Sequence, residues 1–145
     1  SDCPFFITNT PARVSGRGEV IEPIEGKVLP ENLWISIVHP KVHISTKEAF
    51  AGLDLTRTFP TEYPLPVELG YDWQAWNHYY QNHFQEGACK SKPRVQQLIK
   101  DLKLLNPESF TAMTGSGSAC YQISTEPIDL AQFKTENYFT WQGKL

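Results

Sequence analysis

Apolar residues recur along this chain with two different periods. Residues 33–39, Leu-Trp-Ile-Ser-Ile-Val-His, form a nearly continuous apolar run, which is typical of a buried strand. In residues 94–104 the apolar side chains instead follow helical spacing and share one face. These are Val95, Leu98, Ile99 and Leu102. The chain therefore combines at least one buried strand with at least one amphipathic helix.

Weaker patterns predict the remaining elements. Ser45 or Thr46 can cap a helix, and Glu48 follows at nearly the spacing of a capping box. Residues 54–70 contain three prolines and are predicted to be a loop that cannot be helical. The other expected strands are 4–8, 12–15, 109–113, 119–123 and 138–141, and the other expected helices are 72–84 and 128–133.

The order of these elements predicts the fold class. From residue 33 the order is strand, three helices, two strands, helix and strand, with the two middle strands running antiparallel. That order predicts an α+β protein with an antiparallel sheet and helices on one face of it.

Composition and charge exclude several classes of protein. The chain has 145 residues, a length typical of one domain, and no apolar run approaches the ~20 residues of a membrane span. A net charge of −3 argues against a nucleic-acid partner. Cys3, Cys89 and Cys120 are odd in number and lack CxxC spacing, so we expect reduced thiols in a cytoplasmic protein and no metal site.

A glycine loop between the strands predicted at 109–113 and 119–123 is the strongest candidate binding site. It reads Thr114, Gly115, Ser116, Gly117 and Ser118. Glycines let the backbone approach a ligand closely, and the hydroxyls lie beside main-chain N–H groups, a combination suited to an anion. Taken alone, the same letters also describe an ordinary hairpin turn.

Three segments in order resemble the GHMP small-molecule kinases. The first is residues 1–7, Ser-Asp-Cys-Pro-Phe-Phe-Ile, followed by Gly-Arg-Gly-Glu at 16–19. The second is residues 39–50, His-Pro-Lys-Val-His-Ile-Ser-Thr-Lys-Glu-Ala-Phe, and the third is the glycine loop within 113–121. Because the match extends over nearly the whole chain, it is far more specific than the loop alone.

The resemblance implies a reaction and a domain plan. It implies phosphorylation by ATP, with Mg²⁺, of the 2-hydroxyl of 4-diphosphocytidyl-2-C-methyl-D-erythritol in non-mevalonate isoprenoid synthesis. It also implies that residues 1–30 are a remnant of the N-terminal kinase domain and that 31–145 form the ferredoxin-like C-terminal domain. The family's long phosphate loop and its catalytic lysine are not in this sequence, so we expect a C-terminal portion that is inactive alone.

The resemblance also implies roles for individual residues. Asp2 matches the catalytic aspartate, while Thr46, Lys47 and Phe50 match positions that line the cytidine pocket. Lys47 stands where some relatives have proline, which puts its contact in doubt. The glycine loop, Thr114 to Ser118, is expected to take phosphate-bearing ligands. His39 precedes a proline and is expected to be a structural histidine.

Two alternative functions remain open from the sequence. One is a different GHMP kinase, such as a homoserine or mevalonate kinase. The other is a stand-alone ferredoxin-like module that binds a small molecule. The segment His-Pro-x-Val-x-Ile-x-Thr at residues 39–46 favours a kinase of the diphosphocytidyl substrate over other GHMP kinases. The segments 1–7 and 16–19 argue against an isolated module, in which they would have no role. The sequence does not set the oligomeric state.

Overall fold

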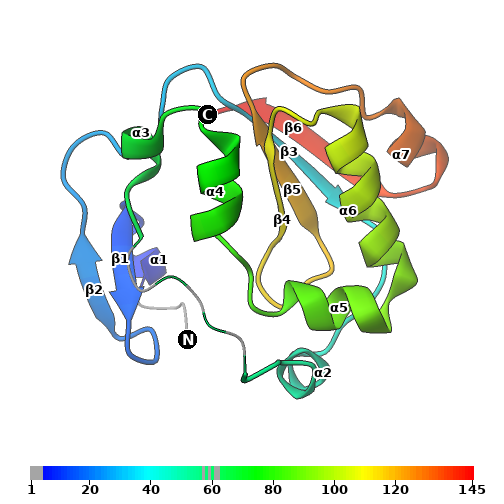
Figure 1. Ribbon diagram of the computed structural model, residues 1–145, viewed down its shortest axis with the longest axis horizontal. Helices are drawn as coiled ribbons and strands as arrows, with labels where there is room; N and C mark the ends of the chain where they lie inside the picture. The colour runs from blue at the N-terminus through cyan, green and yellow to red at the C-terminus, as the bar shows by residue number, and fades with distance from the viewer. Residues whose placement is uncertain (1–4, 57, 59, 61–62) are drawn as a thin grey trace.

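The structure is a computed structural model that describes residues 5–56, 58, 60 and 63–145 (Figure 1). Its elements, in chain order, are α1 (Phe5–Thr8), β1 (Ala12–Ser15), β2 (Val20–Pro23), β3 (Trp34–His39), α2 (Thr46–Ala51), α3 (Pro66–Leu69), α4 (Trp73–Tyr79), α5 (Gln85–Ser91), α6 (Pro93–Leu105), β4 (Phe110–Met113), β5 (Cys120–Ser124), α7 (Ala131–Thr135) and β6 (Phe139–Lys144).

The main sheet is antiparallel, as the sequence predicts. Its four strands lie in the order β4-β5-β3-β6, and every neighbouring pair is antiparallel. Strands β1 and β2 form a separate hairpin, which lies to one side of the main sheet together with α1 (Figure 1). The architecture is therefore α+β, with a main sheet and a small outlying hairpin.

Helices cover both faces of this sheet, which corrects the prediction that they lie on one face. Neighbouring residues of a strand point to opposite faces. On β4, Met113 belongs to a core with Leu98 and Leu102 of α6, whereas Phe110 and Ala112 pack with Trp76 of α4. The four-residue strand β4 is buried along its whole length, and this double burial requires a helix on each side.

The face beneath α6 carries a row of polar side chains across all four strands. Thr111, Gln122, Ser36 and Gln142 are aligned by the strand register. Gln122 donates from Nε2 to the Thr111 hydroxyl at 2.9 Å and to the carbonyl of Leu102 at 2.6 Å. Gln142 donates to the hydroxyl of Ser36 at 2.7 Å. These bonds pair the amide donors of the row, and the bond to Leu102 fixes α6 to the sheet, while the buried Oε1 of Gln122 has no partner among the described residues.

Several predicted elements are confirmed. Helix α6 buries Val95, Leu98, Ile99 and Leu102, the four side chains that its periodicity selects. Ser45 caps α2, and its hydroxyl accepts the N–H of Glu48 at 3.1 Å. The strands predicted at 12–15, 33–39, 109–113, 119–123 and 138–141 are present with small shifts of their ends, and the helix predicted at 128–133 begins at Ala131.

Three predictions about local structure are wrong. The strand expected at 4–8 is not formed: Phe5–Thr8 is helical, no described strand pairs with it, and Pro4 lies outside the described residues. The segment expected to be only loop contains α3, because Pro66 occupies the first helical turn, where its missing N–H costs nothing. The helix expected over 72–84 ends at Tyr79, and a further helix that was not predicted, α5, begins at Gln85.

Strand β2 was not predicted, because the glycines before it indicate only turns. Gly16 and Gly18 both have positive φ, 68° and 100°, and they shape the hairpin turn that joins β1 to β2. The turn residues therefore mark a connection between strands.

The outer edge of β4 is covered by side-chain amides. Asn82 donates to the main-chain carbonyl of Met113 at 2.7 Å, and Gln85 accepts the N–H of the same residue at 2.8 Å. Asn77 donates to the carbonyl of Ser109 at 3.4 Å, just before the strand. These amides take the place of a neighbouring strand.

The described cysteines are free thiols, in agreement with the sequence; Cys3 lies outside the described residues. Burial raises the pKa of Cys120 to about 12 and also raises the pKa of the half-buried Cys89. Both thiols are therefore protonated at neutral pH. None of the helices formed by the described residues is long and apolar enough to cross a membrane.

The packing of α6 predicts a large difference between two leucines of this helix. Leu102 is fully buried, so Leu102→Ala should lower the free energy of unfolding by about 2–5 kcal/mol. Leu104 is 77% exposed, and Leu104→Ala should change it by no more than about 0.5 kcal/mol. Urea unfolding followed by circular dichroism measures both, and equal losses would contradict the assignment of this face.

Candidate functional site

The predicted substrate residues lie on the surface of α2. Thr46 and Lys47 are exposed in its first turn, and the ring of Phe50 is 60% exposed. The predicted catalytic residue, Asp2, lies outside the described residues. The structure thus describes the predicted binding positions but not the predicted proton acceptor.

The exposed ring of Phe50 makes one aromatic contact among the described residues. It meets Phe84, at the start of α5, edge to face with ring centroids 5.0 Å apart. The opposite side of an aromatic ring held in this way is available for stacking on another planar group.

Two further contacts attach α2 to α5 and α6. Glu48 forms an ion pair with Lys92 at 2.7 Å, and this contact lowers the pKa of the Glu48 carboxyl. At the end of α2, the backbone of Gly52 lies so close to α5 that a Cβ on Gly87 would be 2.5 Å from the Gly52 carbonyl oxygen. Helix α2 is therefore held at its middle and at its end.

The glycine loop joins β4 to β5 and contains a tight turn. Thr114 donates its N–H to the carbonyl of Ala119 at 2.9 Å, and its own carbonyl accepts the N–H of Gly117 at 3.0 Å. Gly115, at the first central position of this turn, has a φ of 52°, as a type II′ turn requires. The hairpin-turn interpretation of these letters is thus correct as a description of the backbone.

The same turn leaves main-chain donors available at its tip. Thr114 and Gly115 are exposed and Ser116 is half-buried. Within the part of the chain that the structure describes, the N–H groups of Gly115 and Ser116 make no hydrogen bond. Two neighbouring free N–H groups beside two hydroxyls suit an anionic oxygen.

The far end of the loop is buried against the segment that leads into α2. The hydroxyl of Ser118, which is 1% exposed, donates to the carbonyl of Val42. His39 lies beside it, with Nε2 3.5 Å from the same hydroxyl, and its Nδ1 accepts the N–H of Lys41 at 3.0 Å. His39 therefore has the structural role that its place before a proline predicts.

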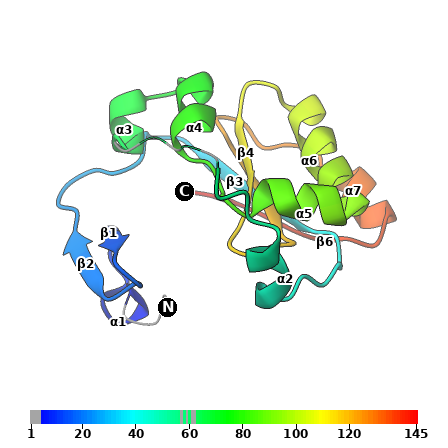
Figure 2. The same cartoon turned by 60° about the horizontal axis from the view of Figure 1, so that its bottom comes forward.

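Gly117 is enclosed where the glycine loop packs on the segment that leads into α2. A Cβ there would lie 2.6 Å from Sδ of Met113 and 3.1 Å from Cδ1 of Ile44, and its φ is +91°. The position requires glycine for both space and backbone conformation. At Gly117 and Ser118 the glycine loop meets the segment before α2, which is far away in the sequence. The two segments lie at the same end of the sheet (Figures 1 and 2).

Asn82 is a residue of this region to which the sequence assigns no role. Its amide nitrogen donates to the carbonyls of Met113 and Gly115, at 2.7 Å and 2.8 Å, and its amide oxygen accepts the N–H of Phe84 at 2.8 Å. The sequence offered one indication of a role for Asn82. Residues 82–84, Asn-His-Phe, resemble an Asn-Asp-[Leu/Phe] stretch of the GHMP kinases, although His83 stands in place of the acid.

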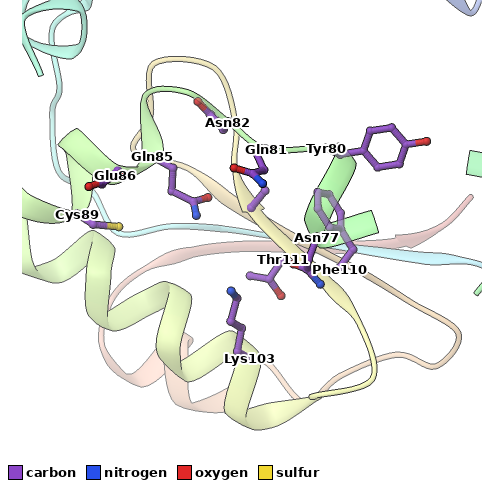
Figure 3. Close-up of a pocket in the computed structure, with 11 residues that line it drawn as sticks. Asn77, Tyr80, Gln81, Asn82, Gln85, Glu86, Cys89, Lys103, Phe110 and Thr111 are labelled. Carbon is purple, nitrogen blue, oxygen red and sulfur yellow. The ribbon is translucent and has the colours of Figure 1, made fainter. Parts of the chain in front are cut away.

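Two cavities lie beside β4, and one of them reaches the glycine loop. One, of about 370 Å³, is lined by Thr114, Gly115 and four tyrosines, Tyr63, Tyr79, Tyr80 and Tyr121. The other, of about 360 Å³, lies along the edge of β4, where Lys103 rises from α6 toward Thr111 and Gln85 (Figure 3). Asn82 lines both cavities. Among the described residues, no three His, Cys, Asp or Glu side chains are grouped in a way that could hold a metal ion.

Comparison with known proteins gives one consistent result, although no protein-family model matches the chain. The chain is 32% identical over 144 residues to the 4-diphosphocytidyl-2-C-methyl-D-erythritol kinase of Porphyromonas gingivalis, covering 99% of this chain and 51% of that protein. It is also 32% identical over 141 residues to the same enzyme of Azobacteroides pseudotrichonymphae, covering 95% and 51%. The chain thus spans about half the length of the curated relatives it matches.

The fold also has a counterpart among solved structures. The structure is similar to the crystal structure of a 4-(cytidine 5'-diphospho)-2C-methyl-D-erythritol kinase, with a TM-score of 0.69 and 20% sequence identity, covering 99% of this chain and 52% of that one. At this identity the likeness shows a shared α+β fold. The recognition made from three sequence motifs is therefore confirmed: over nearly its whole length, this chain is related to the 4-diphosphocytidyl-2-C-methyl-D-erythritol kinases, of which it matches about half.

Proposed function

We propose that this chain is the C-terminal portion of a kinase that transfers the γ-phosphoryl group of ATP to the 2-hydroxyl of 4-diphosphocytidyl-2-C-methyl-D-erythritol. The reaction belongs to the synthesis of isoprenoid precursors in the cytoplasm. The relatives that carry this enzyme's name support the proposal, since they match the chain almost from end to end.

One structural observation carries the proposal: the glycine loop packs on the segment that begins α2. Ser118 is bonded to Val42, and a Cβ on Gly117 would lie 3.1 Å from Cδ1 of Ile44, only a few residues before Thr46. A nucleotide-linked substrate presents a base and phosphate groups at a fixed separation. A surface that joins an exposed aromatic ring to free main-chain N–H groups is suited to binding both parts.

We propose a specific role for each part of this surface. Phe50 stacks on the cytosine ring, while Thr46 and Lys47 contribute a hydroxyl and a charge beside it. The loop from Thr114 to Ser118 receives phosphate oxygens at its free N–H groups. Mg²⁺ bound to the phosphates of ATP would supply charge neutralisation during transfer, and Asp2 would accept the proton of the substrate hydroxyl.

The division into domains is part of the proposal. Residues 31–145 contain β3, two helical regions and the other three strands in the order β-α-β-β-α-β, with the spatial order β4-β5-β3-β6. This arrangement supports a ferredoxin-like C-terminal domain. Residues 1–30 include the separate β1–β2 hairpin, which supports their assignment to a remnant of the N-terminal kinase domain.

The proposed reaction predicts that activity needs the longer protein and Asp2. A protein of the relatives' full length that contains this chain should convert the substrate with labelled ATP, whereas the 145-residue chain alone should form no product. Asp2→Asn in the longer protein keeps the size of the side chain but removes the proton acceptor, so kcat should fall roughly 10²-fold or more with KM nearly unchanged. Product formed by the chain alone would refute the division of roles.

The proposed stacking predicts a specific loss of cytidine affinity in Phe50→Ala. Stacking of a base on an aromatic ring contributes about 1–3 kcal/mol, so the Kd for cytidine diphosphate should rise at least about fivefold in isothermal titration. Phe139→Ala is a matched control, because this ring is exposed to a similar degree, 56% against 60%, and lies on β6. Equal effects of the two variants would contradict a nucleobase site on α2.

The enclosure of Gly117 predicts that its substitution damages both the fold and binding. Gly117→Val places a branched side chain against Met113 at a positive φ and should cost about 1–3 kcal/mol of stability as well as phosphate binding. Gly115→Ala, at a φ of +52° with no atom within 4 Å of the added Cβ, should cost only about 1 kcal/mol. Thermal unfolding and pyrophosphate titration of both variants test this order.

A further inference from the structure

We propose that Asn82 is a positioning residue that sets which way the peptide groups of the glycine loop face, so that the loop presents an N–H and not a carbonyl at its tip. The inference rests on the proposed function in one respect, namely that the loop receives phosphate oxygens. The positioning itself can be measured without any ligand.

The argument begins with the two carbonyls that Asn82 binds. Its amide nitrogen lies 2.7 Å from the oxygen of Met113 and 2.8 Å from the oxygen of Gly115, so both carbonyls point toward the turn between α4 and α5. In a trans peptide the N–H of the following residue points in the opposite direction. Asn82 therefore also determines the directions of the N–H groups of Thr114 and Ser116.

The first of these two directions is verified by a hydrogen bond. The N–H of Thr114 donates to the carbonyl of Ala119 at 2.9 Å, on the side of the loop away from Asn82. The same geometry applied to the next bound carbonyl directs the N–H of Ser116 away from Asn82 as well. That N–H has no partner among the described residues, so it is available to a ligand.

The presence of glycine at position 115 is the reason why the loop needs a side chain that fixes the orientation of its peptide groups. The peptide group between Gly115 and Ser116 turns over by rotation about ψ of Gly115 and φ of Ser116, and glycine, which has no Cβ, accepts both of the ψ values that result, so Gly115 does not itself fix the orientation. The turned-over peptide would direct the Gly115 carbonyl, a partial negative charge, at the position of the phosphate. The hydrogen bond from Asn82 to this carbonyl favours the orientation that attracts an anion.

Asn82 is itself held in place by its other amide atom. Its oxygen accepts the N–H of Phe84 at 2.8 Å, which fixes the side chain at the break between α4 and α5. A side chain at this position must therefore donate two hydrogen bonds and accept one, a combination that a primary amide supplies and a carboxylate does not.

The test compares Asn82→Asp with Asn77→Asp. Asp at 82 keeps the size and the acceptor but loses both donors. Asn77 is a matched control, because it is also half-buried beside β4, and its amide donates to the carbonyls of Trp73 and Ser109, away from the loop. If Asn82→Asp does not fold, Asn82→Ser keeps a donor too short to bridge both carbonyls and serves in its place.

Two NMR measurements on the 145-residue chain decide the matter. The first, without ligand, is the nuclear Overhauser effect between Hα of Gly115 and the amide proton of Ser116, which reports the direction of that peptide group. The second is the shift of the Ser116 amide during titration with inorganic pyrophosphate. We expect Asn82→Asp to change the first and weaken pyrophosphate binding at least tenfold, and Asn77→Asp to change neither.

The outcomes separate this inference from the proposed function. A changed Overhauser effect in Asn82→Asp, with no pyrophosphate binding by the unmodified chain, supports the positioning role and refutes the phosphate role of the loop. An unchanged Overhauser effect in Asn82→Asp, or the same change in Asn77→Asp, overturns the positioning role whatever happens to binding.

Discussion

The arrangement of the candidate site depends on one buried hydrogen bond, from the hydroxyl of Ser118 to the carbonyl of Val42. It joins residues 76 positions apart, and it lies just beyond the last pair of the β3–β5 ladder, Val38 with Cys120. A buried polar pair of this kind contributes only about 1 kcal/mol net, but leaving either group unpaired would cost more. Its main effect is therefore to exclude other positions of the loop.

The polar row beneath α6 likewise excludes alternative arrangements, in this case of the strands in the main sheet. Thr111, Gln122, Ser36 and Gln142 stand in register, and a shift of any strand by one residue would move its member to the opposite face. The apolar core around Leu98 and Leu102 supplies most of the stabilisation. The polar row selects which of several apolar packings is adopted, and so it fixes the end of β4 from which the glycine loop begins.

The parts of the fold with strong periodicity could be predicted from the sequence. Helix α6 and strand β3 follow from the spacing of their apolar residues, and the turn at Gly115 follows from its glycine. Helix α5 could not be found in the same way, because its start is set by tertiary contacts of Asn82 and Gln85 with Met113. The placement of α4 on the second face likewise depends on Trp76 packing against Phe110, a contact that no local pattern encodes.

The candidate site likewise has parts that the sequence could suggest and parts that only the structure reveals. Motif order was sufficient to select Thr46, Phe50 and the glycine loop, but not to show that Ser118 links them. Asn82 was missed because a single asparagine after a helix resembles an ordinary turn residue. Only its distances to the carbonyls of Met113, in β4, and Gly115, in the glycine loop, distinguish it.

The amides along β4 also bear on self-association. A sheet edge with free main-chain groups can recruit a strand from another molecule, and this is a common route to aggregation. Asn77, Asn82 and Gln85 occupy that edge at β4, whereas no described strand pairs with the outer side of β6. Strand β6 also exposes Phe139 and Trp141. Of the two edges of the main sheet, β6 is therefore the one open to strand pairing with another molecule, on the opposite margin from the edge that Asn82 closes.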